Sequence, residues 1–380
     1  MTTPPSASHS GAGLENVVVG SSSICFIDGR EGRLLYRGYD ITDLVEHSTF
    51  EEVVFLLWHG RLPGKKELAE HERALAASRR LPVKVLALLK GFPRKATPTE
   101  VLRTTVSALS LYDSDAENNS REASVRKAMR LTGQLATIVA AWARIRAGKT
   151  PVSPNSKLSA AANFLYMLHG KRPDPLWVRT FDIALILHAD HELNASTFSA
   201  RVTASTLSDL HSAITSAIGT LKGPLHGGAN EAVVRMLQEI REPERAEVWI
   251  KNALAQKRRI MGFGHRVYKT EDPRAAHLRR MAEALGRQSG NLKWYEILRT
   301  IERVVREEKG LYPNVDLYSG ACYHAMGIPV DLYVPIFAVS RISGWTAHVL
   351  EQYADNRLIR PRADYVGPTR LSYVPITERK

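Results

Sequence analysis

Apolar residues recur with the period of an α-helix along most of this chain, and that pattern constrains its fold more than any other feature. After His226, the spacing of six apolar residues predicts one buried helix face: Ala229, Ala232, Val233, Met236, Leu237 and Ile240. Similar patterns in residues 102–112, 131–145, 179–189 and 291–305 are separated by Pro, Gly and Ser rather than by strands. The sequence therefore predicts an all-α fold.

One segment near the N-terminus departs from the helical pattern. Two short runs rich in β-forming residues, 24–27 and 34–37, flank a turn that contains Asp28, Gly29 and Gly32. Alternating β-formers on either side of an Asp-Gly pair are typical of a hairpin. We expect a small β-hairpin here, added to an otherwise helical chain.

Two capping boxes predict where helices start. In the first, Ser48 is the expected cap and Glu51 stands at the third helical position, ahead of the apolar run VVFLLW. In the second, residues 97–100 repeat the device, with proline at the first helical position. Both boxes agree with the helical reading of the chain.

Composition limits the compartment and the number of domains. At 380 residues, with 44% hydrophobic and 24% charged residues, the chain resembles a globular enzyme of about two domains. Cys25 and Cys322 are too few for a disulfide framework and match no metal spacing. The first Lys or Arg is Arg30, unlike a signal or transit peptide, and no apolar run approaches a membrane span. We expect a cytoplasmic protein outside the membrane.

The net charge of +13 suits nucleic acid, an anionic membrane surface or a small polyanionic substrate. Basic residues recur through most of the chain, and several gather around one glycine-rich corner: Lys257, Arg258, Arg259, Arg266, Lys269 and Arg274. Binding to single-stranded nucleic acid also uses aromatic residues along a basic stripe. Aromatic residues make up 7% of the chain and form no such run. A helical nucleic-acid binder is therefore an alternative that rests on charge alone, and we expect no nucleic-acid partner.

Two histidines lie on glycine-rich corners, where a helix is about to begin or has just ended. His226 is part of GPLHGGAN, and His265 is part of GFGHRV. The second motif begins like a dinucleotide-binding fingerprint, but its third glycine is missing and no predicted strand precedes it. A Rossmann site is therefore disfavoured, and the two corners need another explanation, such as contact with a ligand.

Further polar residues extend this set. His188 and His191 are three residues apart and form neither HExxH nor its inversion, so their spacing favours anion binding over a metal site. Asp316 stands at the turn-rich start of a helix, where capping is its alternative role. With His226, His265 and several arginines, these residues supply neutral donors, a carboxylate base and guanidinium clamps. Such a set can remove a proton beside one carbonyl and add the carbanion to another.

Six motifs strongly resemble the citrate synthase family over nearly the whole chain from YRGYDI onward: LHADHELNAST, GPLHGGANE, GFGHRVYKTEDPRA, NVDLYSG, SRISGWTAH and NRLIRPRADYVG. The resemblance implies a homodimer of two-domain helical chains. Residues 1–222 and 329–380 would form a large domain for dimerisation and oxaloacetate binding, and residues 223–328 a small, closing domain. The implied reaction condenses acetyl-CoA with oxaloacetate to citrate and CoA, in the tricarboxylic acid cycle, without a cofactor or metal.

The resemblance also gives roles to single residues. Asp316 would take a proton from the methyl group of acetyl-CoA, His226 would hydrogen-bond the enol oxygen, and His265 would donate to the carbonyl of oxaloacetate. A helix N-terminus would lower the pKa of His226, so that the neutral ring donates. The carboxylates of oxaloacetate would be bound by His191, Arg274 and Arg341, with Arg360 contributed by the partner subunit.

Two points stay open under this resemblance. The CoA phosphates would lie against the basic cluster of Lys257, Arg258, Arg259, Arg266 and Lys269.

The same motifs occur in 2-methylcitrate synthases, which use propionyl-CoA, and one methylene in an apolar pocket changes binding by only about 1–3 kcal/mol. That activity is therefore the alternative. A citrate lyase-type module is disfavoured, because no nucleotide-binding or phosphohistidine region accompanies the motifs.

Overall fold

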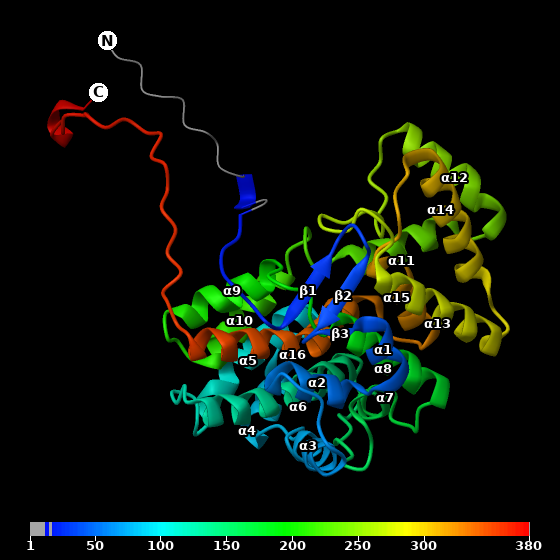
Figure 1. The fold of residues 1–380 in the computed structure, drawn as a ribbon, viewed down its shortest axis with the longest axis horizontal. Helices are drawn as coiled ribbons and strands as arrows, with labels where there is room; N and C mark the ends of the chain where they lie inside the picture. The colour runs from blue at the N-terminus through cyan, green and yellow to red at the C-terminus, as the bar shows by residue number, and fades with distance from the viewer. Residues whose placement is uncertain (1–11, 15–16, 380) are drawn as a thin grey trace.

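The computed structural model describes residues 12–14 and 17–379, and within these ranges the chain forms sixteen α-helices and one small sheet (Figure 1). The helices are α1 Ile41–His47, α2 Phe50–His59, α3 Lys65–Ala77, α4 Val83–Gly91, α5 Pro98–Leu109, α6 Arg121–Arg146, α7 Ala160–His169, α8 Pro175–His188, α9 Ala195–Ser205, α10 Leu210–Leu221, α11 Ala229–Ile240, α12 Pro243–Ala255, α13 Pro273–Ser289, α14 Lys293–Lys309, α15 Val315–Ala325 and α16 Tyr333–Ala354. Short 3-10 helices cover Ala12–Leu14, Ser110–Tyr112, Val330–Leu332 and Ile376–Glu378. Most of the N-terminal segment considered for a targeting signal lies outside the described residues.

The predicted all-α fold is confirmed. The four periodic stretches form α5, α6, α8 and α14, and the stretch after His226 forms α11. On α11 the buried face is turned slightly from the expected one, because Val234 is buried while Ala229 and Ala232 are partly exposed. None of the helices in the described ranges is both long enough and apolar enough to span a bilayer.

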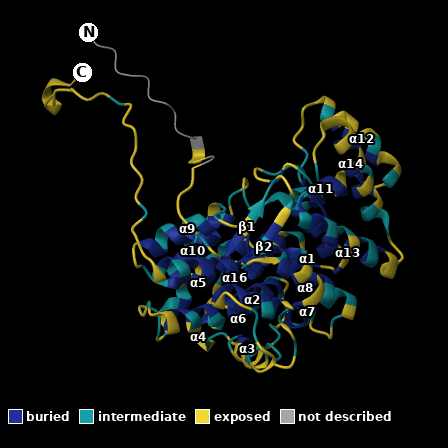
Figure 2. Cartoon of the chain, viewed as in Figure 1, coloured by how far each residue is buried: buried dark blue, intermediate teal, exposed yellow. Residues whose placement is uncertain are grey.

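The centre of the molecule is α16, which is buried along almost its whole length (Figure 2). It packs against α2, α6, α8, α9 and α10. A helix that is apolar on all sides belongs in the interior of a large protein. Its one arginine, Arg341, is carried into that interior and is only 2% exposed.

Helices α11 to α15 gather at one side of the molecule (Figure 1). Within this group α12 packs on α14, α13 on α15, and α11 on α15. Helix α13 also contacts α1 and α8 of the main body. The division of the chain into a large and a small domain stays a prediction, and it is taken up under the proposed function.

The predicted hairpin is confirmed, with each strand shifted by one residue at its ends. Strands β1 (Cys25–Asp28) and β2 (Arg33–Tyr36) pair antiparallel, with Cys25 opposite Tyr36. A third strand, β3 (Tyr39–Asp40), pairs antiparallel with β2. Strand β3 was not predicted, since a strand of two residues is too short to show alternation.

One of the two capping boxes forms as predicted, over residues 97–100. The other prediction is wrong: the cap of α2 is Thr49, whose hydroxyl accepts the amide hydrogen of Glu52 at 3.3 Å. Ser48 instead ends α1, donating to a carbonyl of that helix. Glu51 is buried, and its carboxylate accepts from the first turn of α7. A local contact with α1 therefore engages Ser48, and a tertiary contact with α7 engages Glu51, so the expected box does not form.

The C-terminal segment, residues 355–379, leaves the end of α16 and extends away from the main body (Figure 1). Most of the segment is exposed (Figure 2), and its exposed large apolar side chains include Leu358, Tyr365, Val366, Leu371, Tyr373 and Ile376. Monomeric proteins seldom expose so many large apolar groups in one segment. The segment is therefore suited to pack against another surface.

Candidate active site

His265 lies in the loop between α12 and α13, residues 256–272, hereafter the His265 loop. Its ring contacts those of His191 and Tyr268, with centroids 5.0 and 4.8 Å away. Its Nδ1 accepts the amide hydrogens of Val267 at 3.0 Å and Tyr268 at 3.3 Å. Since Nδ1 is an acceptor, the neutral ring carries its proton on Nε2. His265 therefore offers an Nε2–H donor to a bound molecule.

Both histidines of this contact are held neutral. Burial lowers the pKa of His265 to about 4, and the Arg274 guanidinium acts in the same direction. Burial also holds the pKa of His191 well below its usual range, again with a contribution from Arg274. His191 follows α8 in the elbow of residues 189–194, and its Nε2 is 3.3 Å from the Tyr268 hydroxyl. The pair can donate hydrogen bonds without carrying charge at neutral pH.

His226 lies in the turn between α10 and α11. Its Nε2 is 2.8 Å from Oγ of Ser196, which accepts a hydrogen bond from Nε1 of Trp345 at 3.1 Å. Burial lowers the pKa of His226 to about 4, and Arg341 adds to this effect. The predicted direction is confirmed. The cause is corrected: burial is the largest cause of the lowered pKa, and His226 lies before Gly228, the cap of α11.

Asp316 lies in the first turn of α15 and does not cap that helix. The cap is Asn314, whose side chain accepts the amide hydrogen of Asp316 at 3.0 Å. Burial raises the pKa of Asp316 to about 6, although Arg274 opposes the shift. A carboxylate with this pKa is still largely ionised at neutral pH and is a stronger base than an ordinary aspartate.

Arg274 is buried at the start of α13, where it forms a bidentate ion pair with Asp272. Nε and Nη2 donate to the two carboxylate oxygens at 2.9 and 2.7 Å. The same carboxylate accepts the amide hydrogen of Val315 at 3.3 Å. Asp272 thus joins the N-termini of α13 and α15 and fixes Arg274 near Asp316. Asp272 uses Nε and Nη2, which leaves the Nη1 amino group for other contacts.

Arg341 is held differently. Its guanidinium lies over the ring of Phe337, 4.6 Å from the centroid, and its Nε donates to the carbonyl of His188 at 2.6 Å. Burial lowers the pKa of Arg341 to about 10. In the part of the chain that the structure describes, no carboxylate comes within ion-pair distance of it. A buried cation without such a partner is costly, so a bound anion would be stabilised here.

His188 takes no part in a pair with His191. Its Nδ1 is 2.8 Å from the carbonyl of Ala184 in its own helix, and its ring packs edge-on against Phe337. Among the described residues, no three His, Cys, Asp or Glu side chains are grouped as a metal site would require. The spacing of the two histidines therefore reflects the end of α8 and the turn that follows.

Comparison with known proteins identifies the family. The family described as citrate synthase, C-terminal domain, matches residues 13–362. The chain belongs to the citrate synthase family. It is therefore an enzyme of the acyltransferase class. Citrate synthase 2 from Bacillus subtilis is 54% identical over 368 residues, which are 97% of this chain and 98% of that protein. Citrate synthase from Haloferax volcanii is 53% identical over 372 residues, with coverage of 97% and 98%.

Other family members add a second activity and solved structures. Citrate/2-methylcitrate synthase from Bacillus subtilis is 44% identical over 361 residues, covering 95% of this chain and 97% of that protein. The Pyrobaculum aerophilum citrate synthase structure is 43% identical, with a TM-score of 0.91 and coverage of 97% and 95%. That of Thermoplasma acidophilum, a ternary complex with carboxymethyl coenzyme A and oxaloacetate, is 36% identical, with a TM-score of 0.91 and coverage of 97% and 98%.

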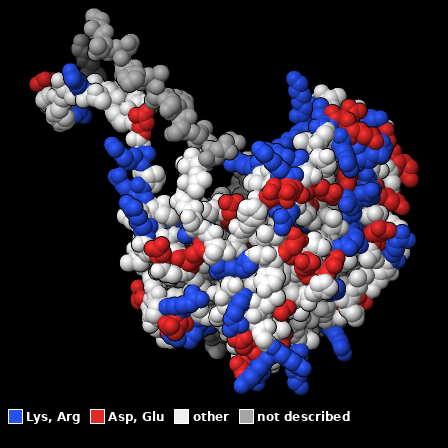
Figure 3. Space-filling model, in the orientation of Figure 1, with Lys and Arg blue, Asp and Glu red and all other residues white. Residues whose placement is uncertain are grey.

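Not every residue expected from the family motifs joins the site within one chain. Arg360 is exposed in the C-terminal segment, and none of the site contacts described above involves it. The expected CoA cluster is also exposed: Lys257, Arg258, Arg259, Arg266 and Lys269. Arg258 pairs with Glu239 at 2.9 Å. Figure 3 shows basic and acidic side chains interspersed over the viewed face. The charge therefore forms no single basic surface on that face.

Sequence reasoning missed several residues that hold this citrate synthase site together. Ser196 and Tyr268 fall inside the quoted motifs, yet only the fold brings them to His226 and His191. Asp272 had a local signal, since an aspartate directly before Pro273 is typical of a helix start. Its second function, pairing with the guanidinium of Arg274, could not be read from that signal.

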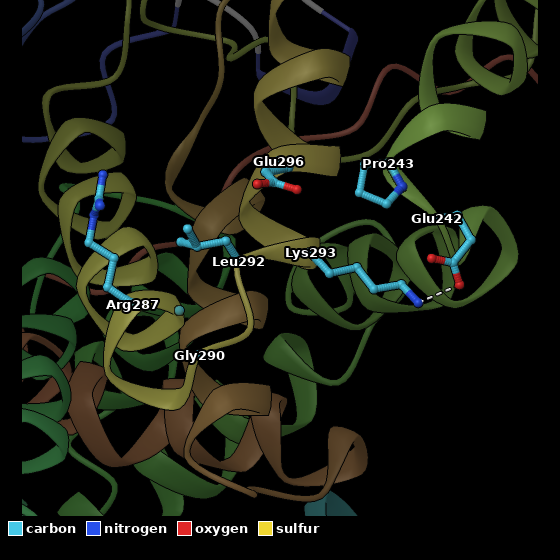
Figure 4. A pocket seen from close by; sticks show the side chains of 8 residues that line it. Glu242, Pro243, Arg287, Gly290, Leu292, Lys293 and Glu296 are labelled. Carbon is cyan, nitrogen blue, oxygen red and sulfur yellow. Dashed lines mark hydrogen bonds and ion pairs between the residues drawn. The ribbon is translucent and has the colours of Figure 1, made fainter.

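A separate surface pocket lies between the start of α12, the end of α13 and the start of α14 (Figure 4). In it, Nζ of Lys293 reaches the carboxylate of Glu242 at 2.5 Å. The pocket shares no residue with the histidines, carboxylates and guanidinium groups described above. We therefore place the reaction at the histidine site and not in this pocket.

Proposed function

We propose that this chain condenses acetyl-CoA with oxaloacetate and then hydrolyses the citryl thioester to citrate and CoA. One observation carries the proposal: two neutral histidines, a base with a raised pKa and two buried guanidinium groups meet in a member of the citrate synthase family. The relative solved with carboxymethyl coenzyme A and oxaloacetate supports these ligands.

In the first step, Asp316 removes a proton from the methyl group of acetyl-CoA. Burial favours this step, because a carboxylate whose pKa is raised to about 6 gains more from protonation than an ordinary aspartate does. His226 donates to the thioester oxygen as the enol forms. Its low pKa keeps the ring neutral. The ring therefore stabilises the enol by donating a hydrogen bond and transfers no proton to it.

In the second step, the enol carbon adds to the ketone of oxaloacetate. The Nε2–H of His265 donates to the ketone oxygen as it becomes an alkoxide, since the Nδ1 of the same ring is fixed as an acceptor. Arg341 and Arg274 bind the carboxylates of oxaloacetate, with His191 beside them. A dianion would supply the counter-charge that Arg341 lacks in the described chain.

We further propose that residues 223–328 form a small domain that closes over the substrates. His265, Arg274 and Asp316 belong to this part of the chain, whereas His191 and Arg341 belong to α8–α9 and α16. A dianion that bridges the two sets would favour the closed arrangement.

The finer parts of the proposal concern assembly and location. We propose a homodimer in which Arg360 completes the site of the partner subunit. The exposed apolar C-terminal segment that carries Arg360 supports this, since a second copy offers a surface on which to bury it. The enzyme would act in the cytoplasm, in the tricarboxylic acid cycle.

The pH dependence of the reaction should report the ionisation of Asp316. We expect kcat/KM to fall about tenfold per pH unit below a pKa of about 6, because the protonated carboxyl cannot accept a proton. His226 and His265, with pKa values of about 4, stay neutral across this range and add no second step above pH 5. Initial rates between pH 5 and 8 measure this. A flat profile down to pH 5 would contradict the assignment of the base.

A thiol-release assay tests the reaction and the acyl group together. With saturating oxaloacetate, kcat/KM for acetyl-CoA should exceed that for propionyl-CoA by about 10–200-fold, as expected for one methylene in an apolar pocket. Without oxaloacetate, no CoA should be released. An equal or higher value with propionyl-CoA would establish the 2-methylcitrate alternative. Absence of CoA release with either thioester, together with salt-sensitive binding to duplex DNA, would favour the nucleic-acid binder.

A further inference from the structure

The β1–β2 hairpin lies between the main body and the α11–α15 group (Figure 1). It contacts two loops that carry histidines of the site. We propose that this hairpin is a positioning brace, which holds the His265 loop against the elbow of residues 189–194 that carries His191. The inference rests on the proposed function of these histidines, and it adds residues of the hairpin to those on which catalysis depends.

The tip of the hairpin makes a close backbone contact with the His265 loop. The carbonyl of Gly29 accepts the amide hydrogen of Lys269 at 2.7 Å. A Cβ placed on Gly29 would lie 2.1 Å from the carbonyl oxygen of Val267. The φ of Gly29 is not in the left-handed region, so glycine is needed here for space and not for an unusual backbone conformation. The tip and the loop can approach this closely only because Gly29 has no side chain.

The contact reaches the catalytic ring through a single residue. Val267 meets Gly29 through its carbonyl, and its amide donates to Nδ1 of His265. That amide helps to fix the tautomer and the orientation of the imidazole. A shift of Val267 therefore changes the direction of the Nε2–H donor, even though Gly29 does not touch the ring.

The base of the hairpin is fixed to the elbow. The buried hydroxyl of Tyr36 donates to the carbonyl of Asp190 at 2.9 Å and accepts the amide hydrogen of the same residue at 3.2 Å. Asp190 directly precedes His191. At the tip the turn is held closed, because Oδ1 of Asp28 accepts the amide hydrogens of Arg30 and Glu31 at 2.9 Å each. A short, closed hairpin thus connects the positions of the two histidines.

Gly29→Ala tests the tip of the brace. Relief of a 2.1 Å contact requires a displacement of about 1 Å, and misplacement of a catalytic group by about 1 Å costs about 100-fold in rate. We expect kcat to fall about 100-fold, with KM for acetyl-CoA unchanged. Amide hydrogen exchange at Lys269, measured without substrate, should accelerate at least about tenfold as its hydrogen bond is lost. The matched control is Gly91→Ala, because an added Cβ there meets no heavy atom within 4 Å.

Tyr36→Phe tests the base of the brace and decides the matter if Gly29→Ala does not fold. It keeps the ring and removes both hydrogen bonds to the elbow, so KM for oxaloacetate should rise about tenfold through His191. The exchange measurement separates this inference from the proposed reaction, since it needs no activity. Wild-type exchange at Lys269 with wild-type kcat in Gly29→Ala, or wild-type kinetics in Tyr36→Phe, would overturn the brace. If exchange at Lys269 were faster in Gly29→Ala than in the wild type, and the wild type itself released no CoA, the brace would stand and the proposed reaction alone would be overturned.

Discussion

Replacing Asp316 by asparagine should abolish almost all turnover while leaving the fold and oxaloacetate binding intact. The amide keeps the size of the side chain but cannot accept the proton of the acetyl methyl group, and loss of a general base costs on the order of 10²–10⁴ in rate. Thiol release by the variant measures the loss. Asp355→Asn is the matched control, because Asp355 is exposed at the end of α16 and outside the site. An Asp316→Asn enzyme that retains a tenth of wild-type turnover would rule out this role.

The same variant should unfold at a higher temperature than the wild type. The folded-state pKa of Asp316, about 6, is above that of an aspartate in an unfolded chain, about 3.9, so the unfolded state favours ionisation. The folded protein therefore loses stability as pH rises from about 4 through about 6, and this cost is fully present at pH 7. Asparagine removes the ionisable group and hence the cost. A lower Tm at pH 7 would show that the carboxylate stabilises the fold instead.

Local signals in the sequence were enough to predict most of the fold. A long amphipathic stretch such as α14 buries one face wherever it packs, so its period identifies it without any knowledge of the partners. The Asp28-Gly29 turn located the hairpin in the same way. The first capping box was predicted wrongly because both of its residues have other partners. Ser48 donates to a carbonyl of α1, and the carboxylate of Glu51 accepts from the first turn of α7.

The candidate site was predictable in its residue types and much less so in its contacts. The motifs single out His191, His265 and Arg274, but the structure alone shows that Arg274 is already paired with Asp272. Helix-terminus reasoning gave the correct direction for the pKa of His226 and the wrong main cause, because burial depends on elements far away in the chain. Spacing within a motif cannot report such long-range desolvation.

Charge was the least informative part of the sequence. The cluster around the His265 loop is basic by composition, yet Arg258 in this loop pairs with Glu239, which is 19 residues earlier and lies on α11. Pairing of this kind is set by the packing of α11 against α12, and it changes which cations are free to meet a phosphate. Net charge therefore bounds the class of ligand, and only the fold decides where that ligand can bind.

Mixing two inactive variants should restore about a quarter of wild-type activity, if the site is shared between subunits. Homodimers of Asp316→Asn and of Arg360→Ala should each be nearly inactive, since every site lacks one group. After the two are unfolded together and refolded, random pairing makes about half of the dimers hybrids, and each hybrid has one intact site of two. Thiol release before and after mixing measures the recovery, with each variant refolded alone as the control.

The expected recovery depends on where Arg360 acts. Within one chain Arg360 is exposed on an extended segment and makes none of the site contacts described above, so a contribution to its own site has no structural support. In a hybrid, the chain with an intact Asp316 receives an intact Arg360 from its partner, while the other site carries both lesions. If Arg360 served its own chain, neither site of the hybrid would be complete, and mixing would yield only the average of the two parents. That result would withdraw the shared site and leave Asp316 as the base of a site contained in one chain.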